Sequence, residues 1–202
     1  APDVRMTVLV TDTAGASDLD PRAHPGVTVL SLDDMRRMEL GAQVCERYGA
    51  TPDELRWALK PVLMMRLLAE HPKVLYCDHD VFFFADPAFL ADMLDQSAVI
   101  LTPHWRSRRA SVDRNNFDRL YVEGLFNAGF VGAHRSGLDA LDLWARNCLA
   151  VCVKDRSRGQ FVDQSHLNLL PVYFDRIGIV RHRGCNVSYW NLIECERVTG
   201  PS

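Results

Sequence analysis

"KVLYCDHDVFFFADP", residues 73–87, joins an apolar run directly to Asp78 and Asp80, with His79 between them. The almost wholly apolar residues 73–77 predict a strand that is buried on both faces, as in a parallel sheet. Asp78 then falls at the carboxyl end of this strand, the edge at which open α/β sheets bind ligands. Because a buried carboxylate is unfavourable without a partner, the two aspartates indicate a ligand or a counter-ion at this edge.

The spacing of the two aspartates suggests a metal site. In a fully extended strand, Asp78 and Asp80 point to the same side and His79 points to the other. Two converging carboxylates repel each other unless a cation lies between them or one of them takes up a proton. Oxygen ligands favour Mg²⁺ or Mn²⁺, and an ion held by one or two protein carboxylates keeps positions free for substrate phosphates. The alternative is a pair of strand-end aspartates that cap the next turn.

Further strands are predicted on both sides of this stretch. A polar loop with Gly, Ser, Asp and Pro separates the first two of them. Strands that alternate with helical segments predict an α/β fold, with a mixed, mostly parallel sheet flanked by helices. The runs rich in β-branched and other apolar residues that predict these strands lie at 4–12, 27–32, 97–102, 125–134 and 177–183.

Helices are predicted between these strands. Thr51, Pro52 and Glu54 fit the N-cap, first-turn and capping-box positions of the first helix. Pro61 is expected to kink or restart this helix, because proline lacks an N–H and its ring clashes with the preceding turn. The segments with apolar residues at helical spacing are 53–70, 136–153 and part of 161–170, and Asp86-Pro87 is expected to begin one more helix.

Composition describes an ordinary globular protein. The 202 residues are 48% hydrophobic and 24% charged, which predicts a single domain over residues 1–202. A net charge of -3 gives no electrostatic reason to expect a nucleic-acid partner. Six cysteines without a zinc-type pair favour reduced thiols. The first residue, Ala1, and the short polar tail suggest a chain trimmed at both ends.

The sequence contains no predicted transmembrane segment. No apolar run reaches the roughly 18 to 20 residues that cross a bilayer. The first residues also lack the order of charged, apolar and small residues that is typical of a signal peptide. We therefore expect a cytoplasmic protein.

Two further motifs carry candidate site residues. "FNAGF", residues 126–130, places Asn127 beside Ala128 and Gly129, where a backbone can closely approach a ligand and an amide can bond a hydroxyl. "FVDQSHLN" places Asp163 and Gln164 at a predicted helix start. The alternatives are a strand glycine required for packing and simple capping of a helix.

The C-terminal part and the first long helix contribute three more candidates. "GCNVSYWNL", residues 184–192, contains Asn186 and Trp190, a mixture suited to stacking on a sugar face while bonding its hydroxyls. Core aromatic residues are the alternative. Lys60, beside the proline of the first long helix, could point at a phosphate, although a lone lysine is more often a solvated helix residue.

An arginine-rich segment at 104–120 has two interpretations. It contains five arginines and one tryptophan in 17 residues. It could be a mobile lid that closes over an anionic donor or acceptor and excludes water. We favour the alternative, a solvated loop.

Taken together, these motifs resemble those of nucleotide-sugar-dependent glycosyltransferases of the GT-A fold. The resemblance rests on the order of Lys60-Pro61, "VLYCDHDVFFFADP", "FNAGF", "FVDQSHLNLLP" and "NVSYWNL". It covers roughly residues 27 to 192 and is similar to bacterial members, with a looser likeness to the retaining glycogenin-like group.

The resemblance implies a role for each candidate residue. Asp78 and Asp80 would form the DxD motif, in which Asp80 binds a Mn²⁺ or Mg²⁺ ion on the donor diphosphate and Asp78 holds the ribose or the metal. His79, Lys60, Asn186 and Trp190 would also belong to the donor site. The residues of the donor-sugar pocket would be Asn127, Ala128 and Gly129, and those that reach the sugar or the reacting centre would be Asp163 and Gln164.

The predicted function is therefore metal-dependent transfer of a sugar from a nucleoside-diphosphate sugar to a glycan, lipid-linked or protein acceptor. The nucleotide base, the sugar and the stereochemical course stay open. Two alternatives remain. A haloacid dehalogenase-type phosphatase also has its nucleophile in a DxD motif after an apolar strand, but Phe82 stands where that family has Thr or Val. The other alternative is a non-catalytic carbohydrate-binding domain.

Overall fold

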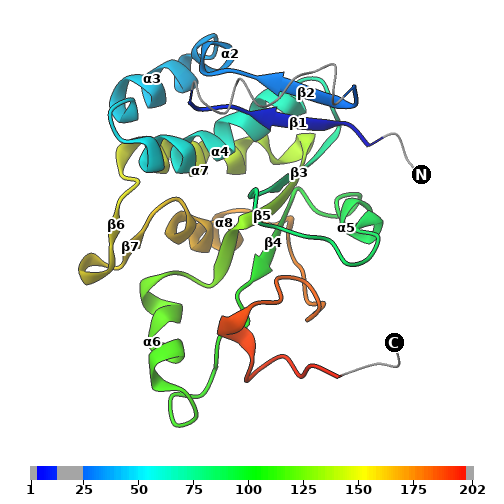
Figure 1. Ribbon diagram of the computed structural model, residues 1–202, viewed down its shortest axis with the longest axis vertical. Coiled ribbons are helices and arrows are strands. Elements are labelled where there is room, and N and C mark those ends of the chain that lie inside the picture. The colour runs from blue at the N-terminus through cyan, green and yellow to red at the C-terminus, as the bar shows by residue number, and fades with distance from the viewer. Residues whose placement is uncertain (1–3, 13–24, 199–202) are drawn as a thin grey trace.

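The computed structural model describes residues 4–12 and 25–198 (Figure 1). The polar loop predicted between the first two strands falls largely at 13–24, outside the described residues. The first two predicted strands are confirmed in shorter form as β1 (Met6–Leu9) and β2 (Val27–Leu30). They pair in parallel, with Met6 opposite Val27.

A four-stranded sheet forms the centre of the structure. Its order is β3 (Lys73–Cys77), β5 (Phe126–His134), β4 (Val99–Pro103) and β8 (Ile177–Ile179). The long strand β5 runs antiparallel to both β3 and β4, and only β4 and β8 are parallel. The prediction of a mostly parallel sheet is therefore wrong, because an apolar run indicates burial and carries no information about strand direction.

Strand β3 also differs from its prediction. It lies at one end of the four-stranded order and its only pairing in that sheet is antiparallel. Most of its residues are half-buried, and only Val74 is fully buried. The expected burial on both faces in a parallel sheet is therefore wrong. Its boundary at Cys77 was predicted correctly.

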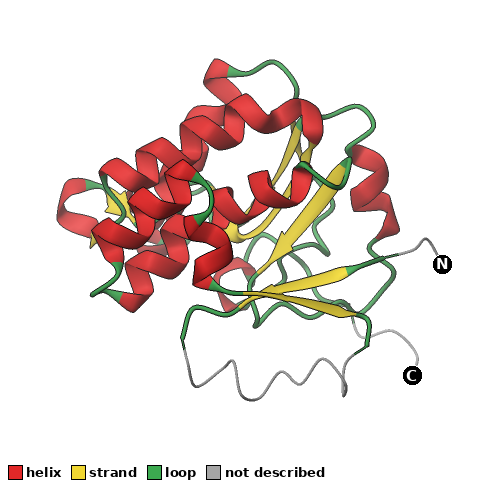
Figure 2. Ribbon diagram, turned by 90° about the horizontal axis from the view of Figure 1, so that it is seen from above, coloured by secondary structure: helices red, strands yellow, loops and turns green. Residues whose placement is uncertain are grey.

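Helices cover both faces of this sheet (Figure 2). On one face, α4 (Pro52–Leu68) and α7 (Leu138–Ala150) pack over β3, β4 and β5 in the main core, which also takes in α3 (Glu39–Tyr48). On the other face, α5 (Ala88–Met93) packs in a smaller cluster. Its buried members are Leu90, Leu94, Ile100, Phe130 and Val180.

Helix α4 differs from its prediction at two places, the N-cap Thr51 and the internal Pro61. The Thr51 hydroxyl donates to the Tyr48 carbonyl (3.2 Å) and makes no cap to the helix, so the predicted capping box is absent. The helix also runs through Pro61 without a restart. Because Pro61 is buried in the main helical layer, we infer that packing on all sides holds the helix together at the missing hydrogen bond.

The remaining elements are short, and several were not predicted from the sequence. The predicted helix at 161–170 appears as two pieces, η3 (Gln164–Leu169) and α8 (Leu170–Tyr173). No helix in the described residues is both long and apolar enough to cross a membrane. The unpredicted elements are the ten-residue helix α3 and the shorter α2 (Leu32–Arg36), α6 (Arg114–Val122), η1 (Arg135–Gly137), β6 (Lys154–Asp155), η2 (Arg156–Arg158), β7 (Gln160–Phe161) and η4 (Tyr189–Asn191).

Gly132 of β5 provides a test of this sheet. A Cβ atom at this position would lie 2.5 Å from Ile100 Cγ1 and 2.9 Å from Leu75 Cδ2. Gly132→Ala should therefore lower the free energy of unfolding by about 1–3 kcal/mol, because the packed strands must shift. Urea unfolding measures this change. Gly26→Ala, where nothing lies within 4 Å of the added atom, is the control. An unchanged midpoint for Gly132→Ala would contradict the packing of β5 between its neighbours.

Candidate functional site

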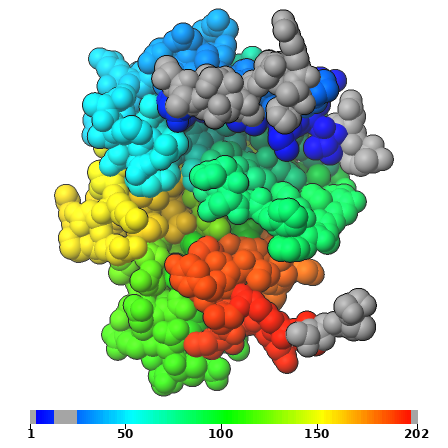
Figure 3. Space-filling view, viewed as in Figure 1, coloured from blue at the N-terminus to red at the C-terminus, as the bar shows by residue number. Residues whose placement is uncertain are grey.

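A pocket opens where β3 and β5 meet α4. Its volume is about 170 Å³. In the space-filling view, the surface recedes where the cyan α4 segment meets the yellow β6–β7 segment (Figure 3). The pocket contains most of the residues predicted from the sequence. It is lined by Trp57, Lys60, Asp78, Asn127, Ala128, Gly129, Lys154, Phe161, Val162, Asp163 and Gln164.

The antiparallel pairing of β3 with β5 brings two of the sequence motifs together. Cys77 lies opposite Phe130, and the Asp78 N–H donates to the Gly129 carbonyl (2.8 Å). A Cβ atom on Gly129 would lie 3.0 Å from both Asp78 Oδ2 and Asn127 Oδ1. Glycine at this position therefore leaves room for two side-chain oxygens that face the pocket.

Lys60 is the charged centre of the pocket. Its side chain is almost fully buried, and its Nζ lies 3.1 Å from Asp78 Oδ1 and 3.2 Å from Asp163 Oδ2. The prediction that Lys60 belongs to the site agrees with this position, and the alternative of a solvated helix lysine is wrong. Burial acts to lower the pKa of Lys60, but the two carboxylates outweigh it and the pKa is raised. The lysine therefore stays charged.

The two carboxylates that flank Lys60 have different surroundings. Asp78 is 33% exposed and accepts a hydrogen bond from the Tyr76 hydroxyl (2.7 Å). Asp163 is 1% exposed, and its carboxylate has no hydrogen-bond partner besides the ion pair with Lys60 in the described part of the chain. Burial raises the pKa of Asp163, while Lys60 acts in the opposite direction. A buried carboxylate with a single cationic partner keeps unused acceptor positions, which indicates a place for a further donor.

The backbone around Asp163 is held in an unusual conformation. Val162 has a φ of 46°, in the left-handed region that β-branched residues rarely adopt. This conformation costs about 1–2 kcal/mol. Trp144 Nε1 donates to the Asp163 carbonyl (2.9 Å) and Val162 N–H donates to the Val153 carbonyl (2.9 Å), which fixes the turn. Such strain persists where surrounding structure enforces it, commonly at functional sites.

Gln164 lines the pocket, but its amide is engaged with the backbone. Its Oε1 accepts from the Ala128 N–H (3.3 Å), and its Nε2 donates to the Glu123 carbonyl (2.6 Å). These contacts connect β5 with the end of α6. Both contacts hold β5 in position. We therefore assign Gln164 a role in positioning β5, and the role at the reacting centre stays a prediction.

His79 and Asp80 lie outside the pocket. Strand β3 ends at Cys77, and the Val81 N–H donates to the Asp78 carbonyl (3.1 Å), which closes a turn. The expectation that Asp78 and Asp80 lie in one extended strand is therefore wrong. Both His79 and Asp80 are exposed on this turn.

The two C-terminal candidates, Asn186 and Trp190, lie in different places relative to the pocket. Asn186 reaches the edge of the site, because the Asn127 amide donates to Asn186 Oδ1 (2.8 Å). Trp190 does not line the pocket and packs against His104, with ring centroids 5.6 Å apart. Trp190 is half-buried and belongs to neither hydrophobic cluster of the described residues. A φ of 62° at Asn186, again in the left-handed region, fixes the loop that carries it.

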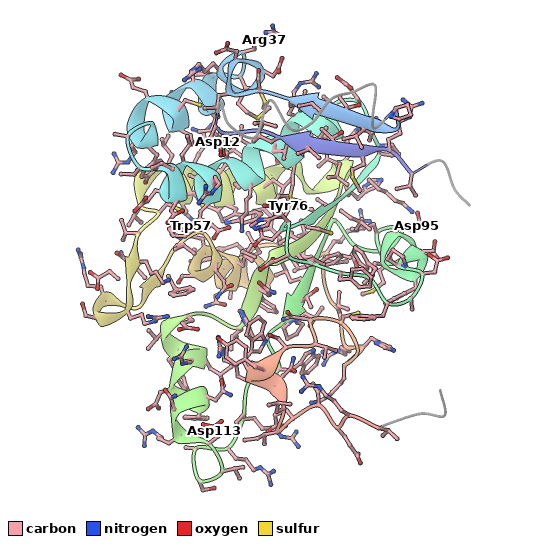
Figure 4. The ribbon with its side chains drawn as sticks, in the orientation of Figure 1. Asp12, Arg37, Trp57, Tyr76, Asp95 and Asp113 are labelled. Carbon is pink, nitrogen blue, oxygen red and sulfur yellow. The ribbon has the colours of Figure 1, made fainter. Side chains whose placement is uncertain are left out.

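Sequence reasoning missed several residues that line the pocket, and also Tyr76, which contacts Asp78 but does not line the pocket. Trp57 lies one turn before Lys60 on α4, and Tyr76 lies two residues before Asp78 (Figure 4). The spacings i,i+3 on a helix and i,i+2 on a strand could have identified both. Lys154 and Phe161 come from the β6–β7 hairpin, which no clear sequence pattern indicates.

The described residues restrict the kind of metal site that can form. Among them, no group of three or more His, Cys, Asp or Glu side chains is placed to hold an ion. Of the two predicted metal ligands, Asp78 is paired with Lys60 and Tyr76, and Asp80 is exposed on the turn outside the pocket. A cage made only of protein ligands is not formed in this part of the chain.

Comparison with known proteins yields distant relatives. No protein-family model matches the chain. The uncharacterized protein YfnD of Bacillus subtilis (strain 168) is 29% identical over 197 residues, which cover 94% of this chain and 60% of YfnD. The uncharacterized protein YfnF of the same organism is 27% identical over 149 residues, which cover 68% of this chain and 47% of YfnF. The chain thus spans about half to three fifths of these relatives.

A solved structure is also similar to this chain. It is the apo form of mouse xyloside xylosyltransferase 1, with a TM-score of 0.48 and 9% identity. The match covers 86% of this chain and 71% of the mouse chain. A likeness this distant does not establish a shared activity.

The raised pKa of Asp163 gives a testable pH dependence. The folded state holds the proton of this carboxyl more tightly than the unfolded state, so the contribution of Asp163 to stability falls as pH rises from its unfolded value, 3.8, through its folded pKa. Asp163→Asn removes this effect. The melting temperature of this variant relative to the parent should therefore increase as the pH rises from 3.8 through the folded pKa of Asp163.

Differential scanning fluorimetry across this pH range checks the prediction. Asp92→Asn on the exposed side of α5 is the matched control and should follow the parent at every pH. A constant difference between Asp163→Asn and the parent would show that the buried carboxyl is not perturbed.

Proposed function

We propose that the protein is a nucleotide-sugar-dependent glycosyltransferase of the GT-A type, with the donor sugar in the pocket between α4 and β5. The observation that carries this proposal is the buried Asp163 carboxylate, which lines the pocket with the Lys60 ammonium group as its one partner among the described residues and with acceptor positions still unused. A sugar hydroxyl would supply that donor. The order of motifs along the chain supports the same class of enzyme.

Each residue of the pocket would have a separate role in binding the donor. Asn127 would bond sugar hydroxyls through the amide that faces the pocket, and the bare backbone of Gly129 would let the donor approach closely. Lys60 would hold Asp78 and Asp163 in place, because it contacts both carboxylates. Trp57 and Phe161 would exclude water from the two sides of the pocket.

The reaction would place positive charge on the donor sugar and negative charge on the nucleoside diphosphate. Asp163 would stabilise the oxocarbenium character of the sugar, or would accept the acceptor proton if the reaction inverts configuration. Asp78 and Asp80 are the residues that would hold Mn²⁺ or Mg²⁺, which when bound supplies a Lewis acid for the departing diphosphate. The acceptor would be a glycan, a lipid-linked sugar or a protein.

Calorimetry with a panel of nucleoside diphosphates tests the binding of the donor. We expect binding in the presence of Mn²⁺ that is lost with a chelator, and Asp80→Ala should weaken it at least about tenfold because a charge-assisted contact is removed. Asp92→Ala is the control. Equal binding by Asp80→Ala and the parent would contradict the assignment of Asp80 to the metal.

Hydrolysis of nucleotide sugars, with water as acceptor, tests the role of Asp163. Asp163→Asn should lower kcat at least about a hundredfold, because the charge beside the sugar is lost. The affinity for the nucleoside diphosphate should change little, since Asp163 is assigned to the sugar. Release of phosphate from an aryl phosphate would instead support the phosphatase alternative. Sugar binding that is unchanged by chelators, without turnover, would support the carbohydrate-binding alternative.

A further inference from the structure

A second charged cluster lies beside the pocket, at the end of α6. Glu123 is only 4% exposed, and its carboxylate contacts three guanidinium groups. Arg106 Nη2 lies 2.6 Å from Oε2, while Arg119 Nη1 and Arg156 Nη2 lie 3.0 and 2.9 Å from Oε1. The three arginines come from the segment after β4, from α6 and from η2. The expectation of a solvated arginine loop at 104–120 is therefore wrong for Arg106, which is buried.

The charges in this cluster do not balance. One carboxylate faces three guanidinium groups, so the cluster keeps an excess of positive charge. The nearby Asp118 does not compensate, because Arg114 Nε donates to both of its oxygens at 2.8 Å. The buried Arg106 takes one oxygen of Glu123, and the partly exposed Arg119 and Arg156 share the other, an arrangement that favours a bound anion.

An open hollow borders this cluster. Its volume is about 410 Å³. Arg119 and Arg156, which line it, are 37% and 50% exposed. Arg119 Nε and Nη2 and Arg156 Nη1 make no hydrogen bond within the described residues, so forked donors remain available. The hollow is lined by Asn115, Asp118, Arg119, Val122, Arg156 and Ser157.

Two residues that line the pocket, Phe161 and Gln164, also contact the cluster that borders the hollow. Phe161 lines the pocket, and the guanidinium group of Arg156 lies over its ring, 5.0 Å from the centroid. Gln164 also lines the pocket, and its amide donates to the backbone of Glu123. A ligand whose reacting hydroxyl lies in the pocket could thus place a neighbouring anionic group against Arg119 and Arg156.

We propose that Arg119 and Arg156 bind a phosphate group of the acceptor substrate. This inference rests on the proposed glycosyl transfer. Phosphate suits the cluster better than a carboxylate, because two forked guanidinium groups with excess positive charge match a dianion with several acceptor oxygens. The acceptor is a better source than the donor, because the residues assigned to the donor diphosphate, Asp78 and Asp80, lie at the end of β3 and do not line this hollow.

Binding of inorganic phosphate and pyrophosphate, measured by calorimetry without metal, tests the inference. Wild-type protein should bind them, and Arg119→Gln and Arg156→Gln should each weaken binding about tenfold or more. Arg146→Gln on α7 is the control and should leave binding unchanged, because Arg146 pairs with Asp142 and neither residue lines the hollow. Each variant keeps two arginines on Glu123, and circular dichroism checks that it folds.

A second measurement distinguishes a phosphate of the acceptor from a phosphate of the donor. The affinity for nucleoside diphosphate with Mn²⁺ should be the same for Arg119→Gln and wild type. Equal weakening of phosphate and nucleoside diphosphate would overturn the assignment to the acceptor. Absence of phosphate binding by wild type would overturn the site itself, while donor hydrolysis would still report separately on the proposed glycosyl transfer.

Discussion

The site depends on the burial of one ammonium group between two carboxylates. Lys60 comes from the middle of α4, where neighbouring side chains form the main core, so its charge requires partners. Asp78 and Asp163 provide them from two segments far apart in the sequence. Removing one member of a buried ion pair costs about 3–5 kcal/mol, so this contact also fixes how α4, the end of β3 and the turn before η3 meet.

The same contact explains why the pocket tolerates unfavourable features. Lys60 offsets the burial of Asp163 only in part, and the strained backbone at Val162 adds a further cost. Neither feature improves packing. Proteins keep such costs where a ligand or a reaction requires them, and a hydroxyl of a donor sugar would supply Asp163 with a second partner besides Lys60.

Much of this site could be predicted from the sequence, because its residues lie at the ends of strands and helices with clear patterns. The boundary of β3 at Cys77 and the glycine of β5 both follow from local rules. The sequence could not predict strand direction, and it therefore gave a mostly parallel sheet. It also missed the turn that separates Asp80 from Asp78, since that turn depends on where pairing with β5 stops. The cluster around Glu123 joins three distant segments, and no local pattern indicates such contacts.

The most direct test of this account is a crystal structure of the protein soaked with Mn²⁺ and a non-hydrolysable nucleotide sugar. We expect the sugar to lie in the pocket with a hydroxyl within about 3 Å of an Asp163 carboxylate oxygen. Lys60 should keep its contacts with Asp78 and Asp163. An ordered donor bound elsewhere, with Lys60 still the sole partner of the Asp163 carboxylate, would contradict the account.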